Sequence, residues 1–236
     1  MQHKNNKSSY ELIADEYYDH THVTSRNLDS ATLEFCNDFN FEMPSEGLVL
    51  ELGCGKGCSG KYCKVESKRI IQLDISRSML RLDPREDCIQ RILGDALKIP
   101  FKSSSFSIVT AFLYDPYNKD DLYMEISRVL KPNGVFIGTL PHSQWLLTLR
   151  KEFGYPLDET KFLTNNNIFL EFNSFLSSDE EIKTKINLAG FKKVRLYEIY
   201  LPKGTKKISP DIKISANKLG IDVNTFSILT LIMARK

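Results

Sequence analysis

The sequence predicts an α/β fold with one doubly wound sheet of about seven strands, mostly parallel, in which the last strand is antiparallel. Two observations predict it. From residue 48 onward, short apolar runs typical of strands alternate with helical patterns, which favours a parallel sheet with helices on both faces. The first of these runs leads directly into a glycine-rich turn, as in open sheets that bind a ligand at the carboxyl ends of their strands.

The N-terminal segment, residues 1–46, is predicted to be a helical extension that forms a lid. Aromatic and apolar residues recur there at helical spacing: Tyr10, Ile13, Ala14, Tyr17 and Tyr18. Ser8 and Glu11 fit a capping box, so the first helix should begin near Ser8. A second helix is predicted over about 29–40.

The sheet domain is predicted over residues 47–236. Its strands are expected at 48–52, 69–74, 88–93, 106–113, 135–140, 194–201 and 226–234. Helices should follow the glycine-rich turn, begin at the caps Ser76 and Asn118, and begin at a second capping box, Ser178 and Glu181. Two less regular stretches are predicted insertions: the aromatic-rich segment 141–177 and the lysine-rich segment 202–223.

Length and composition limit the class of protein. The 236 residues suit one large domain, and 42% hydrophobic with 26% charged side chains exclude disordered, collagen-like and disulfide-scaffold chains. The net charge of +2 argues against a protein dedicated to coating nucleic acid. The N-terminus lacks the apolar segment of a signal peptide, and no run approaches the roughly 18 apolar residues of a membrane span.

The cysteines favour reduced structural thiols. Cys54, Cys58 and Cys63 lie close together, but they lack the spacing and the histidine partners of a zinc site. We therefore expect no metal. The odd total of five cysteines fits a cytoplasmic protein better than a disulfide framework.

The strongest motif is the turn Gly53-Cys54-Gly55-Lys56-Gly57 after the first strand. Glycines allow a tight turn and bring backbone amides close to a ligand. The spacing is GxGxG rather than the GxGxxG of dinucleotide-binding turns, and no Gly-Lys-Ser/Thr follows. Asp74 ends the second strand, where a carboxylate can accept both hydroxyls of a ribose, and Asp95 follows the third strand at the same edge.

At this point the sequence resembles the class I S-adenosylmethionine (SAM)-dependent methyltransferases, which have a Rossmann-like fold. Four blocks match in order: Val49 to Gly57, Leu73 to Ser76, Gly94-Asp95-Ala96 with Ser105 to Val109, and Arg128 to Gly134. The stretch from Tyr10 to Asp19 is similar to the lid helix of many members. The resemblance covers about residues 8–140 clearly and the last strands loosely.

The resemblance implies a set of cofactor-binding residues. Gly53, Gly55 and Gly57 would bring the backbone against the methionine part of SAM, and Glu51 would lie near its ammonium group. Asp74 would hold the ribose hydroxyls, and Asp95 with Ala96 would contact the adenine. Five more residues complete the predicted set: Tyr17 in the lid, Cys54 as a small packing residue, Ile75 and Met79 on the adenine ring, and Phe112. The product would be S-adenosylhomocysteine (SAH).

Several of these residues also have plain structural interpretations. Asp95 can cap a turn, Tyr17 can bury a helix face, and His20 and His22 can be exposed turn residues. The lysines of 202–223 are more often a solvated loop than a binding patch.

The acceptor side should lie where the fourth and fifth strands end. The candidate catalytic residues there are Tyr114, Asp115 and His142. Asp115-Pro116-Tyr117 is similar to the block of amino-group methyltransferases that act on nucleic acid or protein, but it lacks one proline. We therefore expect transfer to an O or N nucleophile of a small molecule, enclosed by the N-terminal helix and 141–177. Nucleic-acid or protein methylation is one alternative, and a non-catalytic SAM-binding regulatory protein is another.

Overall fold

A seven-stranded sheet forms the centre of the computed structural model, which describes residues 6–17, 22–82 and 90–236. The strands lie in the order β3-β2-β1-β4-β5-β9-β8. They are β1 (Val49–Leu52), β2 (Ile70–Asp74), β3 (Gln90–Leu93), β4 (Phe106–Phe112), β5 (Leu130–Pro141), β8 (Lys193–Tyr200) and β9 (Ser227–Arg235). The first five in this order are parallel, whereas β9 is antiparallel to β5 and β8. The predicted sheet with an antiparallel last strand is therefore confirmed.

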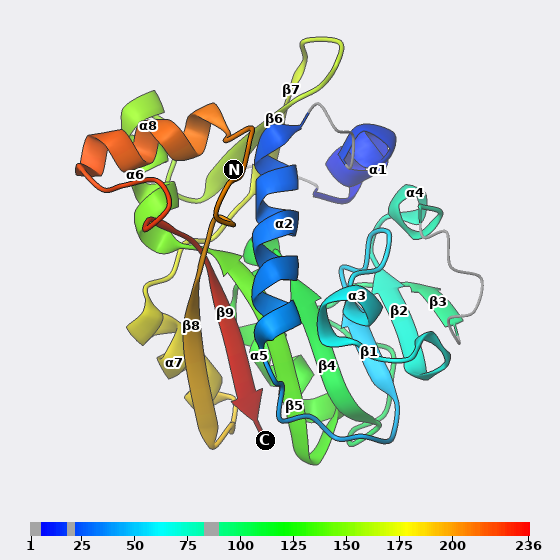
Figure 1. The fold of residues 1–236 in the computed structure, drawn as a ribbon. Helices are drawn as coiled ribbons and strands as arrows, with labels where there is room; N and C mark the ends of the chain where they lie inside the picture. Colours follow the sequence, from blue (N-terminus) through cyan, green and yellow to red (C-terminus); the bar gives the residue numbers. More distant parts are fainter. Residues whose placement is uncertain (1–5, 18–21, 83–89) are drawn as a thin grey trace.

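Helices cover both faces of the sheet (Figure 1). One face carries α2 (Val23–Asp38), the short α3 (Ser59–Cys63), α6 (Ser143–Phe153) and α8 (Pro210–Leu219). The other carries α5 (Asp120–Val129) and α7 (Asp179–Leu188). Because both faces are covered, β1 is buried at all four positions and reads as a continuous apolar run apart from Glu51.

The N-terminal segment divides into two helices with different surroundings. Leu28, Ala31 and Cys36 of α2 belong to the main apolar cluster on the sheet, so α2 is part of the core. In contrast, α1 (Asn6–Tyr17) packs through Ile13 and Ala14 against Met79 and Phe172, outside the sheet. This packing favours α1 alone, rather than all of 1–46, as a covering element.

Both predicted insertions contain regular structure. Residues 141–177 form α6 and a separate hairpin of β6 (Glu159–Leu163) and β7 (Phe169–Asn173), which projects beside α1 (Figure 1). Residues 202–223 contain α8, which the lysine-rich composition obscured. The remaining short elements are α4 (Arg77–Leu80) and two 3₁₀ turns, η1 (Ser67–Arg69) and η2 (Asp115–Tyr117).

The predicted caps are confirmed in two places and wrong in a third. Ser76 accepts a hydrogen bond from the Met79 amide, and Ser178 with Glu181 forms the expected capping box. Asn118, however, does not cap α5, which begins after Lys119. Its side chain is buried and donates to Phe175 O and Ser177 Oγ, because a buried amide needs partners of its own.

The first helix also differs from the expectation, since α1 begins at Asn6 and continues through Ser8. Glu11 is bonded elsewhere, to the amides of Arg77 and Ser78 at the start of α4. The second helix begins at Val23, six residues before the expected start. His20 and Tyr18 lie outside the described residues.

None of the described helices is both long and apolar enough to cross a membrane. Within the same ranges, no three potential metal-ligating side chains come together.

Candidate active site

The glycine-rich turn leads from β1 to α3 in a conformation that requires glycine. Gly53 and Gly55 have φ values of +57° and +50°, in the left-handed region that other residues rarely adopt. A Cβ placed on Gly53 would meet no atom within 4 Å, so the space beside it is open. The turn is closed by the Gly57 amide, which donates to Cys54 O at 2.6 Å.

Asp74 ties this turn to the end of β2. Its Oδ2 accepts from the Gly55 amide and its Oδ1 from the Ser76 amide, both at 2.9 Å. The side chain is only 6% exposed. Burial raises the pKa of Asp74, while these two hydrogen bonds oppose the rise. Each oxygen retains a second lone pair, so the carboxylate can hold the turn and still accept a hydroxyl.

Glu51 is a second buried acid in the same place. Its Oε1 accepts from the amides of Cys58 and Ser59, at 2.5 and 2.7 Å, and its Oε2 accepts from Gln72 at 3.3 Å. Burial raises the pKa of Glu51, against the effect of the two amides. The carboxylate thereby fixes the start of α3.

These groups line a pocket that we call the glycine-loop pocket. It contains ten of the predicted cofactor-binding residues: Tyr17, Glu51, Gly53, Cys54, Gly55, Asp74, Ile75, Met79, Ala96 and Phe112. Gly57 and Asp95 are not in its lining. Asp95 is exposed, and its Oδ1 accepts from the Leu97 amide at 2.9 Å, which is the turn-capping alternative. Its contact with adenine stays a prediction.

A second pocket, which we call the aromatic pocket, adjoins the first. It encloses about 640 Å³ between α1, the start of α2, η2, the β6–β7 hairpin, α6 and the start of α8. The two pockets share six lining residues: Tyr10, Tyr17, Ser25, Leu28, Leu113 and Pro116. The two pockets therefore lie side by side along this shared wall.

Asp115 provides a partly buried acid in the aromatic pocket. Ser174 Oγ donates to its Oδ2, and Arg150 in turn donates to Ser174 Oγ at 2.7 Å. Burial raises the pKa of Asp115 to about 6, although Ser174 and the nearby Arg150 act in the opposite direction. A carboxyl group that titrates near neutral pH suits proton transfer.

The other two candidate catalytic residues are placed less favourably. The Tyr114 hydroxyl bonds to Tyr123 at 3.0 Å, and Tyr123 donates to Asn118 Oδ1 at 2.8 Å, so its proton is committed to a buried chain. Burial also raises the pKa of Tyr114 well above its usual range. His142 lines neither pocket and precedes α6 as its N-cap. Tyr114 nevertheless lines the glycine-loop pocket, and the catalytic roles of Tyr114 and His142 stay predictions.

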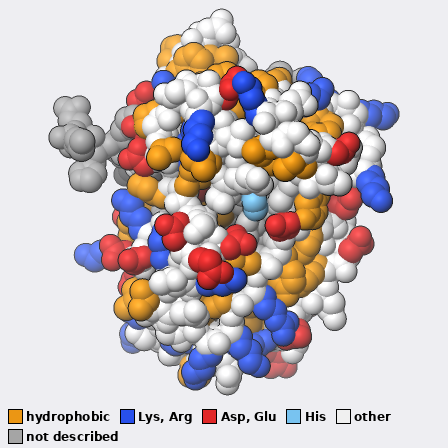
Figure 2. All heavy atoms as spheres, turned by 90° about the vertical axis from the view of Figure 1, so that its left-hand side faces the viewer, with side chains coloured by type: hydrophobic (Ala, Val, Ile, Leu, Met, Phe, Trp, Pro, Cys, Tyr) orange, Lys and Arg blue, Asp and Glu red, His pale blue; other side chains and the backbone are white. Residues whose placement is uncertain are grey.

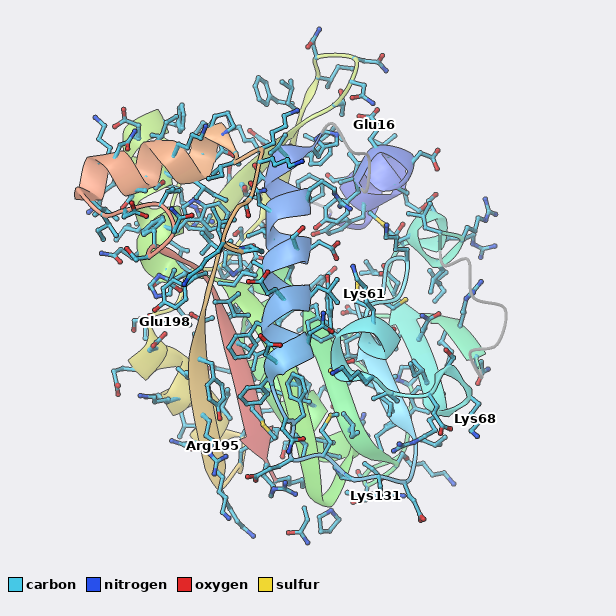
Figure 3. All side chains as sticks on the ribbon, in the orientation of Figure 1. Glu16, Lys61, Lys68, Lys131, Arg195 and Glu198 are labelled. Atoms are coloured by element: carbon cyan, nitrogen blue, oxygen red, sulfur yellow. The ribbon has the colours of Figure 1, made fainter. Side chains whose placement is uncertain are left out.

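Helix α1 is hydrogen-bonded to the protein on the sides of both pockets. Glu11 accepts from the amides of Arg77 and Ser78, at 2.6 and 3.0 Å, on the side of the glycine-loop pocket. Glu16 accepts from the Asn165 amide at 2.7 Å, at the tip of the hairpin (Figure 3). Tyr17, the last residue of α1, lines both pockets.

The sequence missed most of the aromatic pocket. Phe162 and Phe172 belong to the aromatic-rich segment 141–177, for which the sequence predicts no individual site residues, and His22 has the plain interpretation of an exposed turn residue. His22 instead lines the pocket, with its ring 4.3 Å from that of Phe162. That α6 and α8 contribute to the wall of this pocket depends on how distant segments pack, which the local sequence does not indicate.

Comparisons with known proteins agree with this arrangement. Residues 50–138 match the family model for a methyltransferase domain. The mitochondrial protein named Arginine-hydroxylase NDUFAF5 from Danio rerio is 34% identical over 107 residues, covering 44% of this chain and 33% of that protein. The mRNA cap guanine-N(7) methyltransferase of Eremothecium gossypii is 28% identical over 165 residues, covering 58% and 38%. The match thus spans little more than a third of these relatives.

A solved structure extends the likeness to nearly the whole fold. A SAM-dependent methyltransferase of Thermotoga maritima, described as a possible histamine N-methyltransferase, has a TM-score of 0.67 and 18% identity. The alignment covers 98% of this chain and 100% of that one. Residues 50–138 therefore match a methyltransferase domain, and the chain as a whole has the fold of SAM-dependent methyltransferases.

Proposed function

We propose that the protein transfers a methyl group from SAM to an O or N nucleophile of a small molecule. The observation that carries this proposal is the pair of adjoining pockets with a shared wall. SAM in the glycine-loop pocket supplies an electrophilic methyl group. An acceptor in the aromatic pocket would approach it past Tyr17 and Leu113, and such positioning supplies much of the rate in a direct displacement.

The residues proposed to hold SAM fit its chemistry. Asp74 offers acceptor lone pairs for the ribose hydroxyls, and Glu51 is a buried negative charge suited to an ammonium group. The open space beside Gly53 lets a ligand approach the backbone. Ile75 and Met79 offer apolar surface for the adenine. On the acceptor side, Asp115 is the proposed general base.

The size and enclosure of the aromatic pocket support a small acceptor. Its volume of about 640 Å³ lies in the usual range of small-molecule sites, about 300–1,000 Å³. The face formed by α6, α8 and β8 carries basic and acidic side chains interspersed, without one large basic field on that face (Figure 2). Methylation of nucleic acid or protein is therefore the less favoured alternative.

The compartment proposed is the cytoplasm. The four cysteines in the described part of the chain, Cys36, Cys54, Cys58 and Cys63, are free thiols. Burial raises the pKa of Cys36 and of Cys58 to about 12, so both are inert at neutral pH. Thiols of this kind suit a reducing environment.

Calorimetry with SAM, SAH, NAD and ATP tests the cofactor half of the proposal. We expect SAM and SAH to bind and the other two to bind far more weakly; preferential binding of NAD would overturn it. Incubation with labelled SAM and a set of small nucleophiles, followed by mass spectrometry, tests transfer. SAH binding without transfer to any acceptor would favour the non-catalytic alternative.

A further inference from the structure

The aromatic pocket contains a continuous group of rings. Tyr10 and Phe172 lie with ring centroids 4.8 Å apart, and Tyr10 and Tyr17 lie 6.2 Å apart. Phe162 continues the group, with its ring 6.1 Å from Tyr17. All four line the pocket, and the faces of such rings attract cations because of their negative quadrupole.

A carboxylate stands beside these rings. Asp115 lines the same cavity as Tyr10 and Tyr17. Burial is the main cause of the raised pKa of both phenols, and the negative charge of Asp115 adds to it. Its side-chain hydrogen bond from Ser174 engages Oδ2, which leaves lone pairs on Oδ1 for a ligand. Rings and a carboxylate on the wall of one cavity form a receptor for a positive charge.

Two basic residues of the same wall, Arg150 and Lys161, interact with groups of the protein itself. Arg150 is 2% exposed and donates to Leu157 O and Ser174 O, so it holds the chain around the hairpin together. It approaches Asp115 through Ser174 Oγ. Lys161 lies 3.7 Å from the Glu171 carboxylate. Neither cation is thus presented as an anion receptor, and the pocket favours a cationic ligand over an anionic one.

We propose that the acceptor is an organic amine, bound as its ammonium form between the rings of Tyr10, Tyr17 and Phe172 and the Asp115 carboxylate. This inference rests on the proposed function and concerns only the acceptor. An apolar body attached to the nitrogen would occupy the rest of the pocket, against Trp145 and Leu146 of α6.

The transfer step balances with these groups. One proton of the ammonium passes to the Asp115 carboxylate, which frees the nitrogen lone pair. The N–C bond then forms as the C–S bond of SAM breaks, with the electron pair of that bond remaining on sulfur. The products are the acceptor as its N-methylammonium ion and SAH, and the one proton held by Asp115 passes to solvent.

The test compares three ligands of similar size that differ in charge. Phenethylamine, 2-phenylethanol and 3-phenylpropionate are titrated by calorimetry into the full chain saturated with SAH. We expect the amine to bind at least about tenfold more tightly than the alcohol or the carboxylate, since an ammonium on desolvated rings and a carboxylate gains more than about 1.4 kcal/mol.

Two variants test whether Asp115 binds the amine. Asp115→Asn retains an acceptor for Ser174 but removes the negative charge. It should weaken the binding of phenethylamine by about tenfold and leave the binding of 2-phenylethanol unchanged. Asp158→Asn is the matched control, because Asp158 is exposed and lines neither pocket. This variant should leave the affinity for both ligands unchanged.

Three outcomes would overturn the inference: equal or tighter binding of the alcohol or carboxylate, no binding of the amine at millimolar concentration, or an Asp115→Asn variant with unchanged amine affinity. If SAH itself does not bind, the proposed function fails. If SAH binds and the ligand order differs, only the amine assignment fails.

Discussion

Asp74 holds the glycine-rich turn and is also expected to bind the ribose of SAM, and replacing it with Asn separates these two roles. In the structure, each carboxylate oxygen accepts one backbone amide, from Gly55 and from Ser76, at 2.9 Å. An asparagine side chain has one acceptor oxygen, so its NH₂ group must face one of these donors. A buried donor that loses its partner costs about 1–3 kcal/mol.

The stability loss should fall near the lower end of that range. Burial raises the pKa of Asp74, which means that the buried charge itself is costly, and Asp74→Asn removes that charge. We therefore expect the free energy of unfolding to drop by about 1 kcal/mol. Because Asp74 is only 6% exposed, its replacement affects the fold as well as the cofactor site.

The effect on SAM should be larger than the effect on stability. The charge-assisted bonds proposed for the ribose hydroxyls contribute roughly 2–3 kcal/mol, so the affinity for SAM should fall about 30- to 150-fold. Calorimetry with SAH and urea denaturation measure the two quantities on the same protein. Unchanged SAH affinity in a folded Asp74→Asn variant would refute the reasoning. Asp158→Asn serves as the comparison, because Asp158 is exposed and lines neither pocket, and it should change the SAH affinity less than about threefold.

Three further predictions concern the acceptor side and α1. Because the folded pKa of Asp115, about 6, exceeds its ordinary 3.8, its stabilising contribution is complete below pH 3.8 and lost as the pH rises through about 6. Asp115→Asn should thus raise the free energy of unfolding by up to about 3 kcal/mol at pH 7.5 and by less at pH 5. Urea denaturation at the two pH values measures this difference. Glu11→Gln should weaken SAM binding about 5- to 30-fold by loosening α1 from α4, with faster SAH dissociation in stopped flow; an unchanged rate would contradict this. Tyr17→Ala should lower methyl transfer more than about tenfold and SAM binding much less, and a parallel loss of both would assign Tyr17 to the cofactor alone.

The cofactor half of the site could be predicted because its signals are local. The glycine-rich turn follows one buried strand, and the acid about twenty residues later ends the neighbouring strand. Because these strands are parallel, their carboxyl ends lie at the same edge of the sheet. Thus Gly53, Glu51 and Asp74 meet in one pocket, as expected from the sequence. Asp95 shows the limit, because strand ends fix where a residue lies but not which way its side chain turns.

The acceptor half could not be predicted because its walls come from distant segments. Tyr10 and Phe172 are far apart in sequence, yet their rings are 4.8 Å apart. For α8 a local signal existed: Ser209 caps the helix, Pro210 is its first residue and Gly220 follows its end.

Helix α1 makes the two pockets one site. Its inner side carries Tyr10 and Tyr17 into both linings, while Glu11 binds the start of α4 and Glu16 binds the hairpin. If α1 left α4, the aromatic pocket would lose two of its rings and the glycine-loop pocket would lose part of its cover. The proposed lid therefore does more than exclude water from the cofactor, because the acceptor pocket is complete only while α1 is docked.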